Sequence, residues 1–152
     1  MLYENKNRTI LEWLNLNGKS PKEEMREHLK QYFGKEEQRL TDYFSRDRAV
    51  GDSSGLSLLL TELILMGGLQ NDLPLAVTGK INGEGDVLAI GSLKEKIQIA
   101  EKAGFQFMII PSENALEAVN LQKELKTTIE IFDVNHVDKA VELITYLNGK
   151  NN

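Results

Sequence analysis

The sequence predicts an α/β (α+β) fold in which helices pack on a mixed sheet, preceded by a helical N-terminal segment. Three observations support this fold. The first 50 residues carry amphipathic helical patterns, short apolar runs alternate with helical patterns after them, and glycine or proline stands at many boundaries. At 152 residues the chain is long enough to bury a core as one compact domain. We divide it into a mostly helical segment, residues 1–50, and an α/β core, residues 51–152.

The N-terminal segment predicts three helices. Residues 7–16 cluster apolar side chains at helical spacing and end near Asn17-Gly18. The run Ser20-Pro21-Lys22-Glu23 is typical of a helix start, because serine caps the first turn, proline fits within it and glutamate completes a capping box. Gly34 ends this second helix, and a third amphipathic stretch covers about residues 36–46.

The second segment predicts an alternation of helices and strands. The run from Leu56 to Met66 is apolar on nearly every side, so as a helix it has to be central and covered all round. Residues 75–78 and 86–90 predict two strands that the Gly83-Glu84-Gly85 turn joins into a hairpin. The elements expected after them are a helix at 92–103, a strand at 105–110, a helix at 113–125, a strand at 128–134 and a helix at 136–147.

Composition argues against several classes of function. A net charge of −5 disfavours a general nucleic-acid or anionic-membrane binder. The absence of cysteine excludes disulfides, cysteine nucleophiles and thiolate metal sites. The two histidines lack metal-ligand spacing and no carboxylate pair stands out, so we expect no metal and no cofactor. No apolar run is long enough to span a bilayer and no signal peptide is recognised, so we expect a cytoplasmic protein.

The candidate chemistry rests on one serine and one lysine. Ser53 lies in Gly51-Asp52-Ser53-Ser54-Gly55, and Lys96 follows 43 positions later. A serine hydroxyl needs a neighbouring base, and a lysine amine serves as one only while it is neutral, a state that burial favours. Helical geometry places Lys96 in the apolar arc of its helix and Lys94 on the opposite, solvated side. The N-terminus of the helix after Ser53 offers backbone amides to a developing oxyanion.

Each of these features also has a plainer interpretation. Ser53 fits a helix N-cap, and Lys96 fits a lysine whose stem packs on apolar surface while its amine reaches water. The pattern Gly51-x-Ser53-x-Gly55 also fits the nucleophile elbow of α/β-hydrolases, with His136 as the histidine. That elbow requires a buried strand before the serine, and residues 45–50 do not predict one.

Three further runs accompany the serine motif in order. They are Val77-Thr78-Gly79-Lys80-Ile81, the run Val87-Leu88-Ala89-Ile90-Gly91-Ser92-Leu93-Lys94-Glu95-Lys96, and Ile109-Ile110-Pro111-Ser112-Glu113-Asn114. From residue 51 to about residue 144 the chain resembles the proteolytic domain of Lon proteases, in order and in spacing. The resemblance implies that Ser53 is the nucleophile, Lys96 the general base and Thr78 the residue that orients the lysine amine. It also implies that Gly51 and Asp52 form the nucleophile and oxyanion turn.

The resemblance implies a serine-type endopeptidase with a Ser-Lys dyad and a polypeptide substrate. It further implies a homo-oligomer, with a separate ATPase or adaptor as a partner, since no Walker motif is found in these residues. The chain departs from the Lon pattern where Asp52 replaces proline, Lys80 replaces glutamate and Ser92 replaces glycine. Asp52 is expected to stabilise charged Lys96, and residues 1–50 do not predict the strands that precede the nucleophile in Lon. The alternative is therefore a catalytically inactive Lon-like binding or regulatory module.

Overall fold

The computed structural model describes residues 20–44 and 52–150. Its helices are α2 (Pro21–Phe33), α3 (Gln38–Phe44), α4 (Gly55–Leu65), α5 (Leu93–Lys102), α6 (Ala115–Leu125) and α7 (Val137–Lys150). Its strands are β1 (Leu75–Val77), β2 (Lys80–Ile81), β3 (Val87–Leu88), β4 (Phe107–Pro111) and β5 (Glu130–Val134). Two short 3-10 helices, η1 (Asp52–Ser54) and η2 (Ser112–Asn114), precede α4 and α6. The predicted α/β fold is confirmed.

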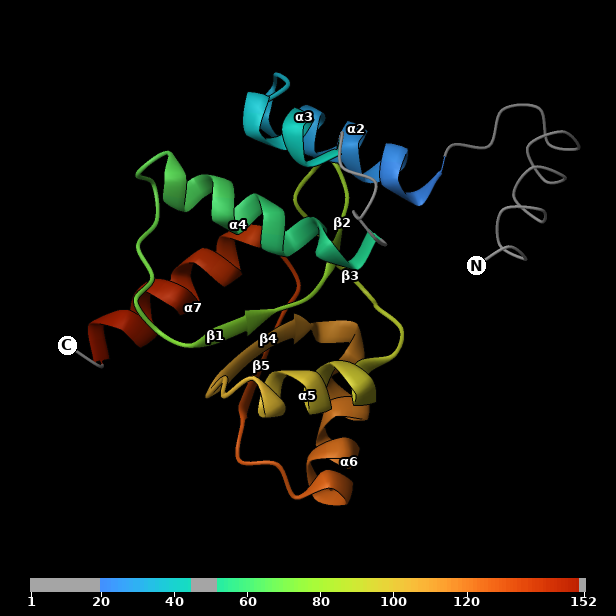
Figure 1. Ribbon diagram of the computed structural model, residues 1–152, viewed down its shortest axis with the longest axis vertical. Coiled ribbons are helices and arrows are strands. Elements are labelled where there is room, and N and C mark those ends of the chain that lie inside the picture. Colours follow the sequence, from blue (N-terminus) through green and yellow to red (C-terminus); the bar gives the residue numbers. More distant parts are fainter. Residues whose placement is uncertain (1–19, 45–51, 151–152) are drawn as a thin grey trace, which may run out of the picture.

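A parallel sheet with strand order β1-β4-β5 forms the middle layer. Helices α4 and α7 lie on one face of it, and α5 and α6 lie on the other (Figure 1). All five residues of the central strand β4 are buried, as expected of a parallel strand covered on both faces. Ile109 packs into the cluster on the α4 and α7 side, whereas Met108 and Ile110 pack into the cluster on the α5 and α6 side.

Helix α2 begins as the sequence predicts. The Ser20 hydroxyl accepts a hydrogen bond from the amide of Glu23 (3.2 Å), and the Glu23 carboxylate accepts one from the amide of Ser20 (3.0 Å). Gly34 ends the helix in the left-handed conformation at φ 74°. Buried Met25 and Leu29 join α2 to the cluster that also holds α4 and the β2–β3 hairpin. This helix therefore packs directly behind the predicted nucleophile turn.

The predicted hairpin pairs different residues from those expected. β1 pairs in parallel with β4, and the antiparallel hairpin is formed by β2 and β3, with Lys80 opposite Leu88. The reason is that the strand is interrupted at Thr78-Gly79, where the backbone hydrogen-bonds to residues 53–56 instead. The amide of Gly79 donates to the carbonyl of Ser53 (2.9 Å), and the amide of Leu56 donates to the carbonyl of Gly79 (3.0 Å).

Helix α4 is not covered on all sides. Leu56 and Leu59 are fully buried, but Leu65 and Met66 are 55% and 52% exposed at the C-terminal end. The expected helix at residues 7–16 lies outside the described residues. Residues 21–44 form helices α2 and α3, and no strand precedes the serine motif within the described part of the chain. No helix among the described residues is long and apolar enough to cross a membrane.

Candidate functional site

Ser53 lies in η1, immediately before α4, in a turn whose backbone is hydrogen-bonded to Thr78 and Gly79. Its carbonyl oxygen accepts hydrogen bonds from the Gly79 amide (2.9 Å) and from the Thr78 hydroxyl (3.5 Å). Gly55 lets the turn approach β2 closely, because a Cβ there would lie 2.9 Å from Cγ1 of Ile81. The side chain of Ser54, at the N-cap of α4, makes no capping hydrogen bond. The backbone of the turn is thus fixed against β2 and the Thr78-Gly79 segment.

Lys96 lies on α5, but at the edge of its buried face rather than within it. Leu93, Ile97 and Ala100 form the buried side of the helix, whereas Ile99 is 66% exposed. Lys96 is half-buried, which corrects the expectation of an amine enclosed by apolar side chains. Its Nζ donates a hydrogen bond to the carbonyl of Gly91 (2.7 Å). No carboxylate among the described residues forms an ion pair with this amine.

Lys94, two residues earlier, differs sharply from Lys96. Its amine hydrogen-bonds and ion-pairs with Glu124 of α6. That hydrogen bond, together with the charge of Glu124, raises the pKa of Lys94 above its ordinary value. An amine held as an ammonium ion cannot take a proton from serine, so Lys94 is unsuited to act as a base. The helical prediction that the two lysines lie in different environments is consistent with this geometry.

Thr78 follows the C-terminal end of β1 and is only 7% exposed. Its amide donates to the carbonyl of Ile109 (3.0 Å), which extends the pairing with β4 by one residue. Its hydroxyl donates to the Ser53 carbonyl, as described above, and makes no hydrogen bond with the Lys96 amine. The role of Thr78 in orienting the lysine stays a prediction.

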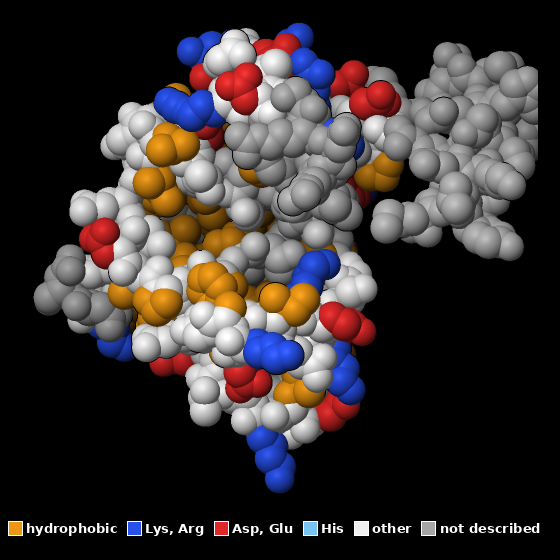
Figure 2. Space-filling view, viewed as in Figure 1, with side chains coloured by type: hydrophobic (Ala, Val, Ile, Leu, Met, Phe, Trp, Pro, Cys, Tyr) orange, Lys and Arg blue, Asp and Glu red, His pale blue; other side chains and the backbone are white. Residues whose placement is uncertain are grey.

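The three predicted residues line one open cleft of about 260 Å³. Its remaining lining residues are Ser54, Ser57, Ala76, Val77, Ile99, Ala100, Phe105 and Met108. Figure 2 shows apolar side chains in a recess between α4 and the outer strand β1. Ser53 reaches the cleft from the α4 side of the sheet and Lys96 from the α5 side. Among the described residues no hydrogen bond joins their side chains, and the lysine amine donates instead to the carbonyl of Gly91.

Asp52 contacts a different lysine from the one expected. Its carboxylate ion-pairs with Nζ of Lys80 on β2 (3.1 Å), and both side chains are about one third exposed. The two residues are both departures from the Lon pattern, and here they compensate each other's charge. His28 of α2 lies against the same corner and donates from Nδ1 to the carbonyl of Ile81 (2.9 Å). Gly51, the other residue assigned to this turn, lies outside the described residues.

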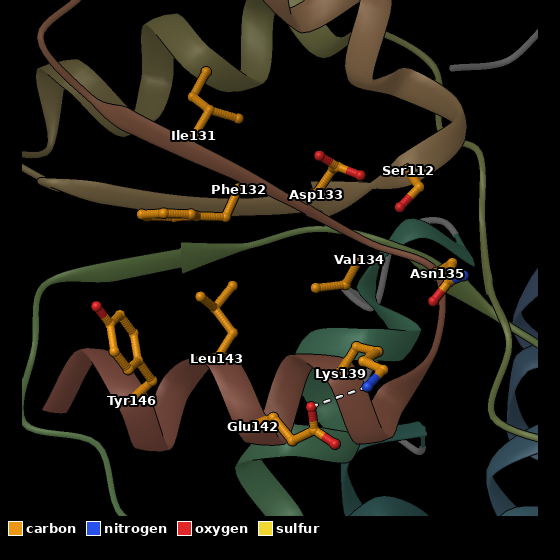
Figure 3. Close-up of a pocket in the computed structure, with 10 residues that line it drawn as sticks. All are labelled: Ser112, Ile131, Phe132, Asp133, Val134, Asn135, Lys139, Glu142, Leu143 and Tyr146. Carbon is orange, nitrogen blue, oxygen red and sulfur yellow. Dashed lines mark hydrogen bonds and ion pairs between the residues drawn. The ribbon is translucent and has the colours of Figure 1, made fainter. Parts of the chain in front are cut away.

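A larger hollow lies elsewhere, along β5 and α7, and has a volume of about 560 Å³ (Figure 3). It contains Ser112 and Lys139, but the Lys139 amine turns toward Glu142 and forms an ion pair with it at 3.1 Å. Because this lysine is paired with a carboxylate and Ser112 lies away from it, the hollow does not combine a nucleophile with a base. The smaller cleft at Ser53 is therefore the better candidate for an active site than the larger hollow.

Sequence reasoning missed Lys80, Gly91 and Asn114 as parts of this region. Lys80 carried a signal, since it reverses the charge of the Lon pattern two residues after Thr78 while Asp52 introduces the opposite charge. Gly91 contributes a backbone carbonyl, and the Asn114 side chain bonds to the backbone of Ile90, so no residue pattern reveals either contact. Within residues 20–44 and 52–150, no cluster of three or more histidine, aspartate or glutamate side chains is arranged to hold a metal ion.

Comparison with known proteins shows which family this chain resembles. A family model described as the Lon protease (S16) C-terminal proteolytic domain matches residues 26–146. The chain is 34% identical over 92 residues to the Lon protease of Rickettsia bellii, 31% over 93 residues to that of Orientia tsutsugamushi and 36% over 91 residues to that of Clostridium beijerinckii.

These alignments cover 60–61% of this chain but only 11–12% of each relative. The chain thus spans a small part of the length of the curated relatives it matches. The family match is broader, because it begins within α2 and includes η1, the cleft and most of α7. This chain belongs to the Lon protease (S16) C-terminal proteolytic domain family, a family of serine peptidases.

Proposed function

We propose that this chain is a serine-type endopeptidase in which Ser53 is the nucleophile and Lys96 the general base. The observation that carries the proposal is the cleft that Ser53, Thr78 and Lys96 share in a Lon-type proteolytic domain. A carbonyl oxygen accepts a hydrogen bond from a neutral amine as well as from an ammonium ion, whereas an ion pair requires the ammonium ion. The Gly91 carbonyl thus holds Lys96 without demanding its charged form, in contrast to the carboxylate beside Lys94.

The reaction begins when the neutral Lys96 amine takes the proton of the Ser53 hydroxyl as its oxygen attacks the carbonyl carbon of a peptide bond. For this transfer the amine has to lie within about 2.6–3.2 Å of that hydroxyl in the complex with substrate. The resulting oxyanion lies near the N-terminus of α4, where backbone amides and the helix dipole stabilise negative charge.

Collapse of this intermediate breaks the peptide C–N bond, and the Lys96 ammonium ion gives its proton to the leaving amine. The N-terminal part of the substrate stays as an ester on Ser53. Water then attacks that ester while Lys96 again accepts a proton, and the carboxylic acid product leaves. None of these steps consumes a nucleotide or requires a metal. An open cleft with apolar walls suits an extended or unfolded polypeptide as the substrate.

The test uses a fluorescently labelled unfolded protein and follows its fragments by gel and mass spectrometry. We expect the wild-type chain to cleave it, Ser53→Ala to abolish cleavage and Ser112→Ala, which alters the larger hollow, to leave it unchanged. All three proteins should show the same unfolding temperature. Equal cleavage by wild type and by Ser53→Ala would reject the proposal.

A second candidate is a non-catalytic module that binds polypeptides through the same cleft. The observation that favours it is that the Lys96 amine bonds to the Gly91 carbonyl and forms no hydrogen bond with Ser53 among the described residues. In that case the wild-type chain binds the unfolded protein without cleaving it, and Ser53→Ala binds it equally well. Fluorescence anisotropy alongside the cleavage assay separates the two functions.

A further inference from the structure

Asn114 is a buried polar residue outside the proposed dyad whose side chain is fully engaged. It is 6% exposed and stands at the N-cap of α6, yet its side chain makes no capping hydrogen bond to that helix. Its Oδ1 instead accepts from the amide of Ile90 (3.0 Å), and its Nδ2 donates to the carbonyl of the same residue (3.0 Å). A third bond joins Nδ2 to Glu117 (3.0 Å).

Two hydrogen bonds to one distant residue reproduce what a neighbouring strand would supply to Ile90. The chain needs this substitute, because Ile90 lies in the irregular segment between β3 and α5. Glu113 adds one further contact by accepting a hydrogen bond from the amide of Ala89 (3.3 Å). The turn before α5 is therefore tied to η2 and α6 by side chains. Buried hydrogen bonds of this kind are costly to remove, since they leave donors or acceptors without partners.

The residue that follows Ile90 is Gly91, whose carbonyl accepts the hydrogen bond from the Lys96 amine. Ser92 comes next and adopts the left-handed conformation at φ 56°, which costs energy for a residue with a side chain. A strained conformation persists only where its surroundings fix it. The carboxamide of Asn114 is a buried contact to Ile90, one residue before the Gly91 carbonyl and two before Ser92.

We infer that Asn114 is a positioning residue for Lys96, acting through Ile90 and the carbonyl of Gly91. This inference rests on the proposed function of Lys96 as the base. Asn114 touches neither substrate nor reacting atoms, so its loss should slow the chemical step and leave substrate binding nearly intact. A misplacement of about 1 Å costs up to about 100-fold in rate, and we expect kcat to fall at least about tenfold in Asn114→Ala with KM within about twofold of wild type.

The test adds a readout that does not depend on activity. The side-chain NMR signal of Lys96 in lysine-labelled protein is assigned by its disappearance in Lys96→Ala. We expect this signal to move in Asn114→Ala and to stay in place in Asn120→Ala, an exposed control on the same helix. Glu117→Ala removes one bond to the carboxamide and leaves both bonds to Ile90, so it should affect kcat and the signal much less.

Asn114→Gln provides a second variant in case the alanine variant does not fold. It keeps an uncharged carboxamide but displaces it by one methylene, so we expect an intermediate change in kcat and in the Lys96 signal. A folded variant with an unmoved Lys96 signal overturns the inference, whether or not kcat falls. If the wild-type chain does not cleave at all, the proposed peptidase fails, and the Lys96 signal alone decides whether Asn114 positions that amine.

Discussion

The Ser53 cleft and the hollow along β5 each contain a lysine and at least one serine. They differ in what holds the lysine. In the hollow, Lys139 pairs with a carboxylate one turn away on α7, whereas in the cleft Lys96 bonds to a backbone carbonyl. The two sites also differ in the contacts of the serine. Thr78 and Gly79 donate hydrogen bonds to the carbonyl of Ser53 and fix its turn. The size of a cavity is thus a poorer guide to chemistry than the partners of its polar groups.

Substitution of Lys96 gives the largest expected effect on kcat. Lys96→Ala should lower kcat by about 10²–10⁴-fold, because a general base contributes about that much. Lys96→Arg should be equally inactive, since a guanidinium does not give up its proton. Lys139→Ala and Lys94→Ala serve as matched controls and should retain wild-type kcat. Peptidase assays on the four variants check this, and an active Lys96→Arg variant would show that charge rather than base strength is needed.

Substitution of glycine by alanine tests how closely atoms pack at the Ser53 turn and on α7. Gly55→Ala would push a Cβ against Ile81, which is 1% exposed, and should lower the free energy of unfolding by about 1–3 kcal/mol. Gly149 of α7 has no atom within 4 Å of the position that a Cβ would take, so Gly149→Ala should raise stability by up to about 1 kcal/mol. Urea unfolding measures both variants. Equal effects at the two glycines would mean that the turn at Ser53 is not tightly packed.

Backbone strain provides a smaller effect. Ser92 at the start of α5 and Lys126 at the end of α6 both adopt positive φ, at 56° and 51°. Replacement of either residue by glycine should stabilise the fold by about 1 kcal/mol, because glycine pays no penalty in this conformation. Thermal and urea unfolding of Ser92→Gly and Lys126→Gly check the two sites together. Destabilisation by Ser92→Gly would contradict the strained turn described before α5.

The two ion pairs give the smallest expected effect. Asp52–Lys80 is about one third exposed, whereas both Lys139 and Glu142 are more than 60% exposed. Double-mutant cycles should give coupling energies of about 0.2–1 kcal/mol, with Asp52–Lys80 at the upper end of that range. Only the Asp52–Lys80 cycle should also change kcat, since that pair joins the nucleophile turn to β2. A coupling energy larger for Lys139–Glu142 than for Asp52–Lys80 would contradict this prediction.

Much of the fold was predictable because its signals are local. The capping box at Ser20, the apolar strand at Phe107–Pro111 and the helices on either side of it follow from residue spacing within each segment. The hairpin was assigned to the wrong strand because β1 pairs with β4, about 30 positions away, and a local pattern does not encode that choice. Exposure of the end of α4 also depends on which elements reach it.

The residues of the candidate site could be proposed from the sequence, whereas their contacts could not. The ordered motifs identified Ser53, Thr78 and Lys96, and the structure gathers them in one cleft. Three contacts could not be predicted from the sequence. They are the ion pair of Asp52, the carbonyl that accepts from Lys96 and the carboxamide that bonds to Ile90. Each of these contacts joins segments 24 or more positions apart or uses backbone atoms, which every residue has.

The central claim is that Lys96 makes the Ser53 hydroxyl nucleophilic, and covalent labelling tests it most directly. A peptidyl fluorophosphonate forms a stable bond with an activated serine, and mass spectrometry of the digested protein locates it. We predict one adduct for each chain, on Ser53, formed at the wild-type rate in Lys94→Ala and Lys139→Ala and at least about 100-fold more slowly in Lys96→Ala. An adduct on Ser112, or labelling of Ser53 at an unchanged rate in Lys96→Ala, would contradict the claim.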